Sequence, residues 1–212
     1  MKIIKNASLL AVTALALVAT NVYAVQAGDI LVRVGAAHVA PQADDEDFYN
    51  KNHIHLDVDG DTQLGLNFTY MLTDNIGVEL LAATPFTHDV TSSTLGGQTI
   101  AEVKHLPPTL TVQYHFNPTG TVRPYVGAGV NYTLMLESKA TGPLEGTPLD
   151  TSDSFGLAGE AGVDIDLGNG FFVNAAAWYA DINTDVDVGN GTFKGELQID
   201  PWVYMVGVGT SF

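Results

Sequence analysis

Residues 63–70 read Gln-Leu-Gly-Leu-Asn-Phe-Thr-Tyr, and every second position carries a large apolar side chain. Successive side chains of a β-strand point to opposite faces, so a period of two predicts a strand with one apolar and one polar face. A similar alternation recurs at 109–116, 126–134 and 202–209. These four segments predict an all-β chain.

Extending the pattern in both directions predicts strands of about ten residues, separated by turn-rich segments. The predicted strands cover eight ranges: 28–40, 62–72, 76–86, 108–117, 122–137, 154–167, 171–186 and 197–212. Three links between them are short: 73–75, 117–121 and 168–170. The other links are longer and polar: 41–61, 87–107, 138–153 and 187–196. Asp181 would break the alternation of the seventh strand, so we expect it above the membrane or beyond a bulge.

Charged residues help to separate a soluble sandwich from a membrane barrel, because both folds show the same alternation. Six of them fall on the face opposite the large apolar side chains: Asp29, Arg33, Glu79, Arg123, Glu160 and Asp164. In a barrel that spans a membrane, the apolar face points to lipid and the other face lines a narrow interior. Alternating link lengths, aromatic residues near strand ends and the final Phe212 favour the same class. The sequence thus predicts an eight-stranded antiparallel up-and-down transmembrane β-barrel in the bacterial outer membrane.

The first residues indicate a secreted precursor. Lys2 and Lys5 precede an uncharged apolar stretch at 7–20, and Val-Tyr-Ala24 then supplies small residues for a signal peptidase. We therefore expect two parts: a signal peptide at 1–24, and at 25–212 a barrel with four longer extracellular loops.

Composition narrows the range of partners. Without its first two lysines the chain has six basic residues against 24 acidic ones, a net charge of −18. This charge excludes nucleic acid as a partner, because nothing would neutralise the phosphates. The chain has no cysteine, so neither a disulfide nor thiolate chemistry is available. We also expect neither a metal ion nor a cofactor.

Five longer stretches carry a more specific signal. They are Thr62–Met71, Asp74–Phe86, His105–Leu110, Arg123–Thr133 and Asp200–Met205. In this order they resemble the OmpW family of bacterial outer-membrane proteins, and the resemblance runs through most of the mature chain.

The resemblance implies an eight-stranded barrel that passes small hydrophobic molecules across the outer membrane. It further implies a hydrophobic pocket in the lumen at Leu81 and Trp178. A lateral opening towards the lipid would lie near Pro107 and Pro108.

The alternation agrees with this pocket, because Leu81 shares a face with Glu79 and Trp178 shares a face with Asn174. Both large apolar side chains should therefore point inward. Eight strands leave room for side chains or for one small ligand, so the two residues either plug the barrel or form a pocket.

The two prolines act through the backbone. Neither Pro107 nor Pro108 can donate to a strand ladder, so pairing at the start of the fourth strand should be interrupted. They either end a loop or open a gap in the wall. Five lumen charges are expected to pair as a structural plug that bars apolar cargo: Arg33, Glu79, Arg123, Glu160 and Asp164.

The sequence must also be compared with two other classes of function. A structural or adhesive barrel would use its long loops as a receptor or interaction surface, and the sequence names no toxin or phage that binds there. An enzyme would need His88 or His105 beside Ser92 or Ser93, and these fall in predicted loops with no strand to hold them in register. We therefore expect no enzyme activity.

Overall fold

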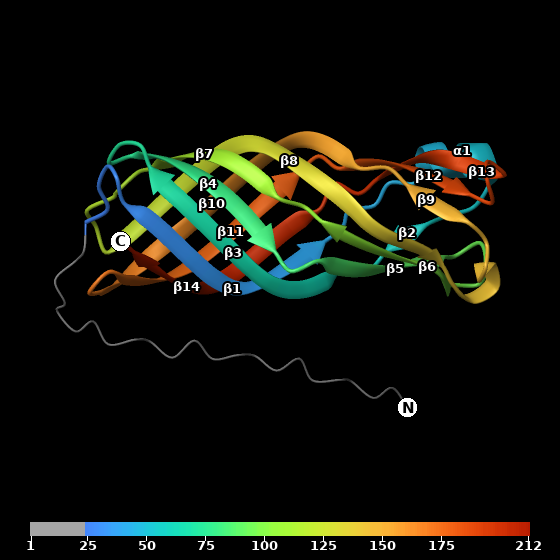
Figure 1. Ribbon diagram of the computed structural model, residues 1–212, viewed down its shortest axis with the longest axis horizontal. Coiled ribbons are helices and arrows are strands. Elements are labelled where there is room, and N and C mark those ends of the chain that lie inside the picture. The colour runs from blue at the N-terminus through green and yellow to red at the C-terminus, as the bar shows by residue number, and fades with distance from the viewer. Residues whose placement is uncertain (1–23) are drawn as a thin grey trace, which may run out of the picture.

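Eight long antiparallel strands close on one another in the computed structural model, which describes residues 24–212 (Figure 1). They are β1 (Ile30–Ala40), β3 (Asp61–Met71), β4 (Ile76–Ala83), β7 (Thr109–His115), β8 (Val122–Ala140), β10 (Ser154–Gly168), β11 (Phe171–Ala180) and β14 (Trp202–Ser211). Each pairs with the next, and β14 returns to pair with β1 from Leu31↔Ser211 to Ala40↔Trp202. The predicted eight-stranded up-and-down barrel is confirmed. The expected signal peptide at 1–24 lies outside the described residues except for Ala24.

The two faces of the wall divide as the alternation predicts. On β3, Leu64, Phe68 and Tyr70 are about half exposed, whereas Asn67 and Thr69 are fully buried inside the barrel. Two paired strands approach each other so closely at one point that a side chain would not fit there. At the seam between β1 and β14, a Cβ atom on Gly35 would lie 2.3 Å from the carbonyl oxygen of Val206.

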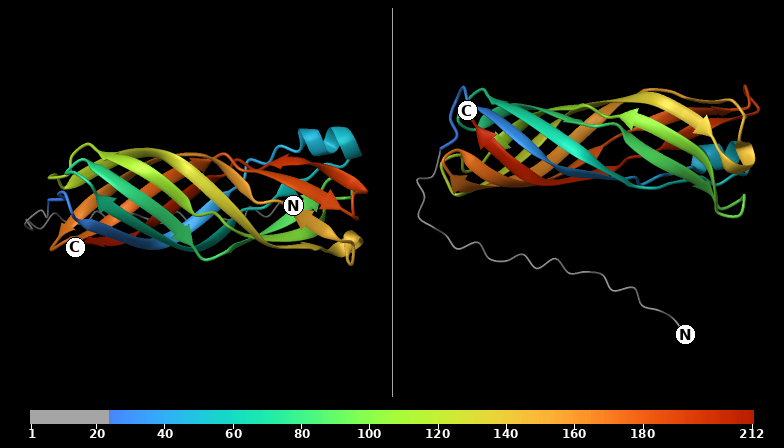
Figure 2. Two further views of the ribbon diagram at one scale, coloured as in Figure 1. Left: turned by 45° about the horizontal axis from the view of Figure 1, so that its top comes forward. Right: turned by 60° about the horizontal axis from the view of Figure 1, so that its bottom comes forward.

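At the end of the barrel where the long links connect the strands, the structure continues as an upper tier of shorter elements (Figures 1 and 2). These are α1 (Glu46–Asn52), β2 (Asp57–Val58), β5 (Phe86–Ser92), β6 (Gln98–Leu106), the 3-10 turn η1 (Gly142–Leu144), β9 (Leu149–Thr151), β12 (Asn183–Val188) and β13 (Phe193–Gln198). β5 and β6 form a hairpin that pairs with the upper part of β8, and β13, β12 and β9 form a small sheet. Among residues 24–212, no helix has the length and apolar composition needed to cross a membrane.

This upper tier corrects the expectation that the long links are irregular loops. Four of the predicted strands differ from the observed bounds by three residues or more, and one of them, expected at 122–137, continues to Ala140. The strand expected at 171–186 ends at Ala180, and the chain pairs again only from Asn183, in the small sheet. The strand expected at 76–86 ends at Ala83, and the last one begins at Trp202 rather than 197.

Asp181 lies in the break after β11, past the end of the barrel strand as expected. The neighbouring backbone leaves the ladder there, because the amide of Ile182 donates to the carboxylate of Asp200 at 3.0 Å.

The outward face of the β5–β6 hairpin is charged. Asp89 and Glu102 are exposed and Lys104 is half-buried, and Asp89 pairs across the hairpin with Glu102. Charged side chains of this kind are costly against hydrocarbon. The hairpin therefore lies above the membrane-spanning part of the barrel.

Candidate functional site

Arg33 is the centre of a polar network in the half of the lumen nearest the short turns. Its guanidinium donates to both carboxylate oxygens of Asp164, at 3.1 and 2.7 Å. It also donates to Asn67 at 2.9 Å and to Thr69 at 2.7 Å, and it lies 3.6 Å from Glu79. A fully buried cation is tolerated only when its charge and its donors are matched in this way.

The other four predicted lumen charges are also buried. Glu79 accepts hydrogen bonds from Gln113 and from the indole of Trp178. Glu160 accepts from Thr111 at 2.8 Å. Arg123 lies 3.7 Å from a carboxylate oxygen of Asp166.

Asp166 is a further lumen charge, outside the five that are expected from the sequence. It lies two residues after Asp164 on the same strand and is also buried. The alternation alone would have found it. Together these residues fill this half of the lumen with buried charges and hydrogen-bonding groups, so no apolar path runs through it.

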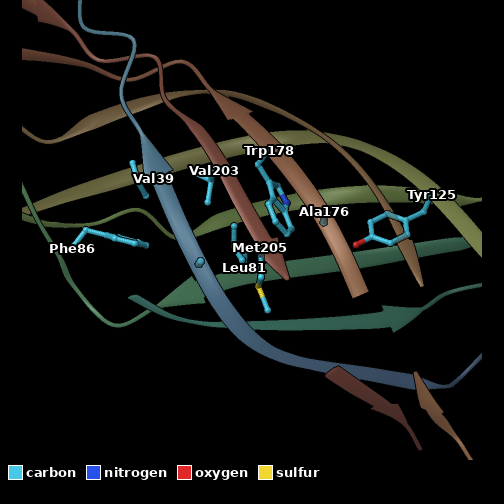
Figure 3. Close-up of a cluster of buried hydrophobic side chains, with 9 residues drawn as sticks. Val39, Leu81, Phe86, Tyr125, Ala176, Trp178, Val203 and Met205 are labelled. Atoms are coloured by element: carbon cyan, nitrogen blue, oxygen red, sulfur yellow. The ribbon is translucent and has the colours of Figure 1, made fainter. Parts of the chain in front are cut away.

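Above this network the lumen becomes apolar (Figure 3). Leu81 from β4 and Trp178 from β11 are buried and line one cavity with Phe86, Val39 and Val203. The empty space is only about 20 Å³, roughly enough for one water molecule. The side chains themselves therefore nearly fill the inner cavity.

The indole of Trp178 forms the boundary between the two zones. Its Nε1 donates to Glu79 at 3.2 Å, while its ring is buried in the apolar cluster. The indole contacts Glu79 but neither member of the Arg33–Asp164 pair through a hydrogen bond.

The wall is interrupted beside this cavity. Pairing between β4 and β7 ends at Leu81↔Thr109, and pairing between β5 and β6 begins at Phe86↔His105. In the described chain, no ladder joins residues 82–85 to residues 106–108. We call this gap in the strand pairing the wall break.

Pro107 and Pro108 lie in the interrupted segment. Asn131 on β8 turns its amide towards both proline carbonyls, at 3.3 and 3.4 Å, and the amide of Tyr132 donates to Pro108 at 3.0 Å. The segment is therefore held from the β8 side only. Leu81, Trp178 and Pro107 line the same cavity, whereas Pro108 is not part of its lining.

A second apolar pocket lies inside the upper tier. It has a volume of about 200 Å³ and an almost wholly apolar lining, which includes Phe48, Leu56, Val90, Leu149 and Val186. The sequence pattern did not predict this pocket, because the long links carry no extended alternation and are expected to be loops.

A signal for this pocket exists in the sequence. Residues 54–58 read Ile-His-Leu-Asp-Val and residues 185–188 read Asp-Val-Asp-Val, each with a period of two. His55, Asp57 and Asp185 are exposed, whereas the apolar residues of both segments are partly or fully buried.

Three of the four residues considered for catalysis lie on strands rather than in loops. His88 and Ser92 are on β5 and His105 is on β6, all buried, whereas Ser93 follows the end of β5. The expectation that no strand holds them is wrong for His88, Ser92 and His105. Within the described part of the chain, Ser92 Oγ has no hydrogen-bond partner, so it forms no serine–histidine pair.

Comparison with known proteins places the chain in a family. The sequence model of the OmpW family matches residues 26–212. The chain belongs to the OmpW family. Outer membrane protein W of Vibrio cholerae serotype O1 is 44% identical, with 93% of this chain and 94% of that protein covered. Outer membrane protein W of Escherichia coli K12 is 39% identical, with 98% and 100% covered.

A solved structure supports the same assignment. The crystal structure of the outer membrane protein OprG from Pseudomonas aeruginosa superposes with a TM-score of 0.80 at 39% identity, covering 88% of this chain and 97% of that one. The chain is thus a β-barrel of the bacterial outer membrane, and its eight long strands are the membrane-spanning ones.

The outward face of the OmpW-family barrel matches that location. Phe155, Tyr179 and Trp202 are exposed near the long-link ends of their strands. Tyr132 and Tyr179 direct their hydroxyls to Asp153 and Asp200, at 3.0 and 3.2 Å. Rings that bury an apolar body and keep a polar tip in water are typical of a membrane interface.

Proposed function

We propose that this OmpW-family protein is a passive conduit for small hydrophobic molecules. Cargo enters the upper apolar pocket from outside the cell and passes to the inner cavity at Leu81 and Trp178. It then leaves sideways into the lipid of the outer membrane through the wall break at Pro107 and Pro108. One observation carries the proposal: the apolar part of the lumen ends on a charged network at the level where strand pairing is interrupted.

The charged network makes a straight path through the barrel unfavourable. Cargo moving that way would have to separate pairs such as Arg33–Asp164, which are joined at 2.7 Å and fully buried. Removing one partner of a buried ion pair costs about 3–5 kcal/mol. The break in the wall requires no such separation, because its backbone groups are not joined across the seam.

The inner cavity suits transient occupancy. Its free space of about 20 Å³ means that a ligand enters only when Leu81 or Trp178 moves aside. Burying about 150–200 Å² of apolar surface gives about 4–5 kcal/mol before the costs of association, which corresponds to affinity of about millimolar or weaker. A site that attracts cargo and also releases it is what passage requires.

The proposed partners are therefore small apolar molecules and the membrane lipid that receives them. No catalytic step is part of the proposal, since Ser92 Oγ has no hydrogen-bond partner among the described residues. The five lumen charges have a structural role, because they close the lumen below the cavity.

A reversible cross-link across the wall break tests the proposal. The chain has no cysteine, so the pair Ala83→Cys and Pro107→Cys would be its only thiols. Both positions line the inner cavity. Uptake of a radiolabelled apolar solute is measured in cells that lack any other copy of the protein. Cells are used because the saccharide-covered outer leaflet of their outer membrane slows the entry of apolar solutes without a protein.

We expect the oxidised pair to reduce uptake to the level of cells without the protein, and reduction to restore it. The reduced variant is the control for folding and expression. Equal uptake before and after oxidation would contradict lateral release. Equal uptake with and without the protein would contradict the conduit and favour a structural or adhesive barrel.

A further inference from the structure

Three rings stack where the upper pocket meets the inner cavity. The ring centroids of His88 and His105 are 4.8 Å apart, and the ring of Phe86 lies 6.3 Å from His88 and 5.9 Å from His105. The planes differ by only 23–28°. Val90 and Val103 line the upper pocket, whereas Phe86 and His105 line the inner cavity. On β5, His88 comes between Phe86 and Val90, so its ring lies between the two spaces, although it is part of the lining of neither.

The hydrogen bond of His88 identifies its free nitrogen as an acceptor. Its Nδ1 lies 2.5 Å from the backbone oxygen of Asp59. A carbonyl oxygen only accepts, so Nδ1 carries the hydrogen and Nε2 of the neutral ring keeps a lone pair. That Nε2 is buried and has no partner among the described residues, and His88 as a whole is 3% exposed.

Both imidazoles are neutral at neutral pH. Burial lowers the pKa of His88, and this outweighs its hydrogen bond to Asp59 and the nearby carboxylates of Asp59 and Asp61. Burial, followed by repulsion from His88, lowers the pKa of His105 to about 3. The upper-tier rings therefore present aromatic faces and a lone pair without a positive charge.

We infer that His88 determines specificity in this conduit, favouring small uncharged aromatic molecules that carry one hydrogen-bond donor, such as phenols and indoles. A flat ring packs against the three stacked rings, and its O–H or N–H group satisfies the unpaired Nε2 of His88. An apolar molecule of equal size leaves that acceptor unsatisfied. This inference rests on the proposed function, because it describes what the same path selects.

The two tryptophans of the chain, Trp178 and Trp202, allow a direct test. Trp202 is exposed on the outer face of the barrel, whereas Trp178 lines the inner cavity together with His105. In a Trp202→Phe variant the only indole fluorescence comes from the lumen. Heavy-atom quenching of that fluorescence then reports entry of a brominated molecule.

The probes are 4-bromophenol and 4-bromotoluene, which differ by a hydroxyl in place of a methyl group. Each is titrated into the variant in lipid nanodiscs, and its free concentration is corrected for partition into empty nanodiscs. We expect 4-bromophenol to half-saturate the quenching at about one tenth of the concentration that 4-bromotoluene needs. A tenfold difference corresponds to about 1.4 kcal/mol.

Substitution assigns the preference to one atom. His88→Phe keeps a ring and removes the acceptor, so the two probes should become equal within about twofold. The matched control is Asp89→Asn, the next residue on β5, which faces outward and should keep the tenfold preference. His88→Leu is a second variant if His88→Phe fails to fold.

The outcomes separate this inference from the proposed function. Equal quenching by both probes in the Trp202→Phe protein would overturn the selectivity and leave the conduit standing. A preference that survives in His88→Phe and in His88→Leu would overturn the role of His88. Quenching of Trp178 by neither probe would contradict the conduit itself, and the selectivity would fall with it.

Discussion

Arg33 joins elements that are far apart in the chain. Its partner Asp164 is 131 positions away, and Asn67 and Thr69 come from the neighbouring strand. The alternation predicted which charges face the lumen, because it depends only on local sequence. It did not predict which charges pair, since that depends on where strands across the lumen come to lie once the barrel has closed.

Removal of Arg33 should be strongly destabilising. Arg33→Leu leaves Asp164 and Glu79 buried without their cation, and we expect the free energy of unfolding to fall by about 3–5 kcal/mol. Lys139→Met is the matched control, because its pair with Glu137 lies at the surface, where solvent screening leaves an ion pair little effect on stability. Urea unfolding in lipid vesicles measures both. A loss no larger than that of the control would contradict the role of Arg33.

His105 should make the upper tier sensitive to acid. Its pKa falls from 6.5 to about 3 on folding because the ring is buried. Below about pH 6.5 the unfolded imidazole binds a proton that the folded one does not, so stability falls as the pH falls, down to about pH 3. Between pH 7.5 and pH 5 we expect a loss of about 2 kcal/mol. Hydrogen exchange of the β5 and β6 amides measures this loss of stability. In His105→Leu the stability of the hairpin should depend less on pH. An equal dependence on pH in that variant would refute the assignment to His105.

At the level of elements, the sequence located the eight barrel strands but not the upper tier. Long strands such as β3 give several periods of alternation, which is a strong signal. β2, β9 and β12 have two, three and six residues, so their alternation is brief. Their pairing depends on partners far away in the sequence, as β12 with β9 shows. Local pattern therefore could not distinguish them from loops.

The wall break is also a feature of the strands and their pairing, and it should depend on both prolines. Replacing them together, Pro107→Val with Pro108→Thr, restores two backbone N–H donors and permits the strand to pair. We expect the amides of 106–109 to become protected from hydrogen exchange and uptake of apolar solute to fall several-fold. Pro124→Val, on the outward face of β8, is the control and should leave uptake unchanged. Unaltered uptake with a closed ladder would count against the lateral route.

At the scale of the whole molecule, the barrel has a closed lower half, an apolar middle and an apolar upper pocket. The family and the fold expected from the sequence are confirmed. The roles of Leu81, Trp178, Pro107 and Pro108 stay predictions. The structure brings Leu81, Trp178 and Pro107 to one cavity, which is the arrangement that those roles require.

A charge in the apolar middle should stop passage. In the double variant Leu81→Arg, Trp178→Arg, two guanidinium groups occupy the cavity, and one of them lies near Glu79. We expect uptake of apolar solute to fall to the level of cells without the protein, while the barrel still inserts. Lys104→Gln, above the membrane on β6, is the control for expression and should retain uptake. Undiminished uptake in the double variant would exclude the cavity from the path.

The seam between β1 and β14 has a consequence for biogenesis. The first and last strands of the barrel are neighbours, and Gly35 lies opposite Gly207. A nascent polypeptide that stops before β14 exposes two unpaired margins, each with a row of unsatisfied amide and carbonyl groups that hydrocarbon cannot solvate. Insertion is therefore a post-translational event that waits for the final ten residues or so, and any machinery that inserts this protein must hold it open until then.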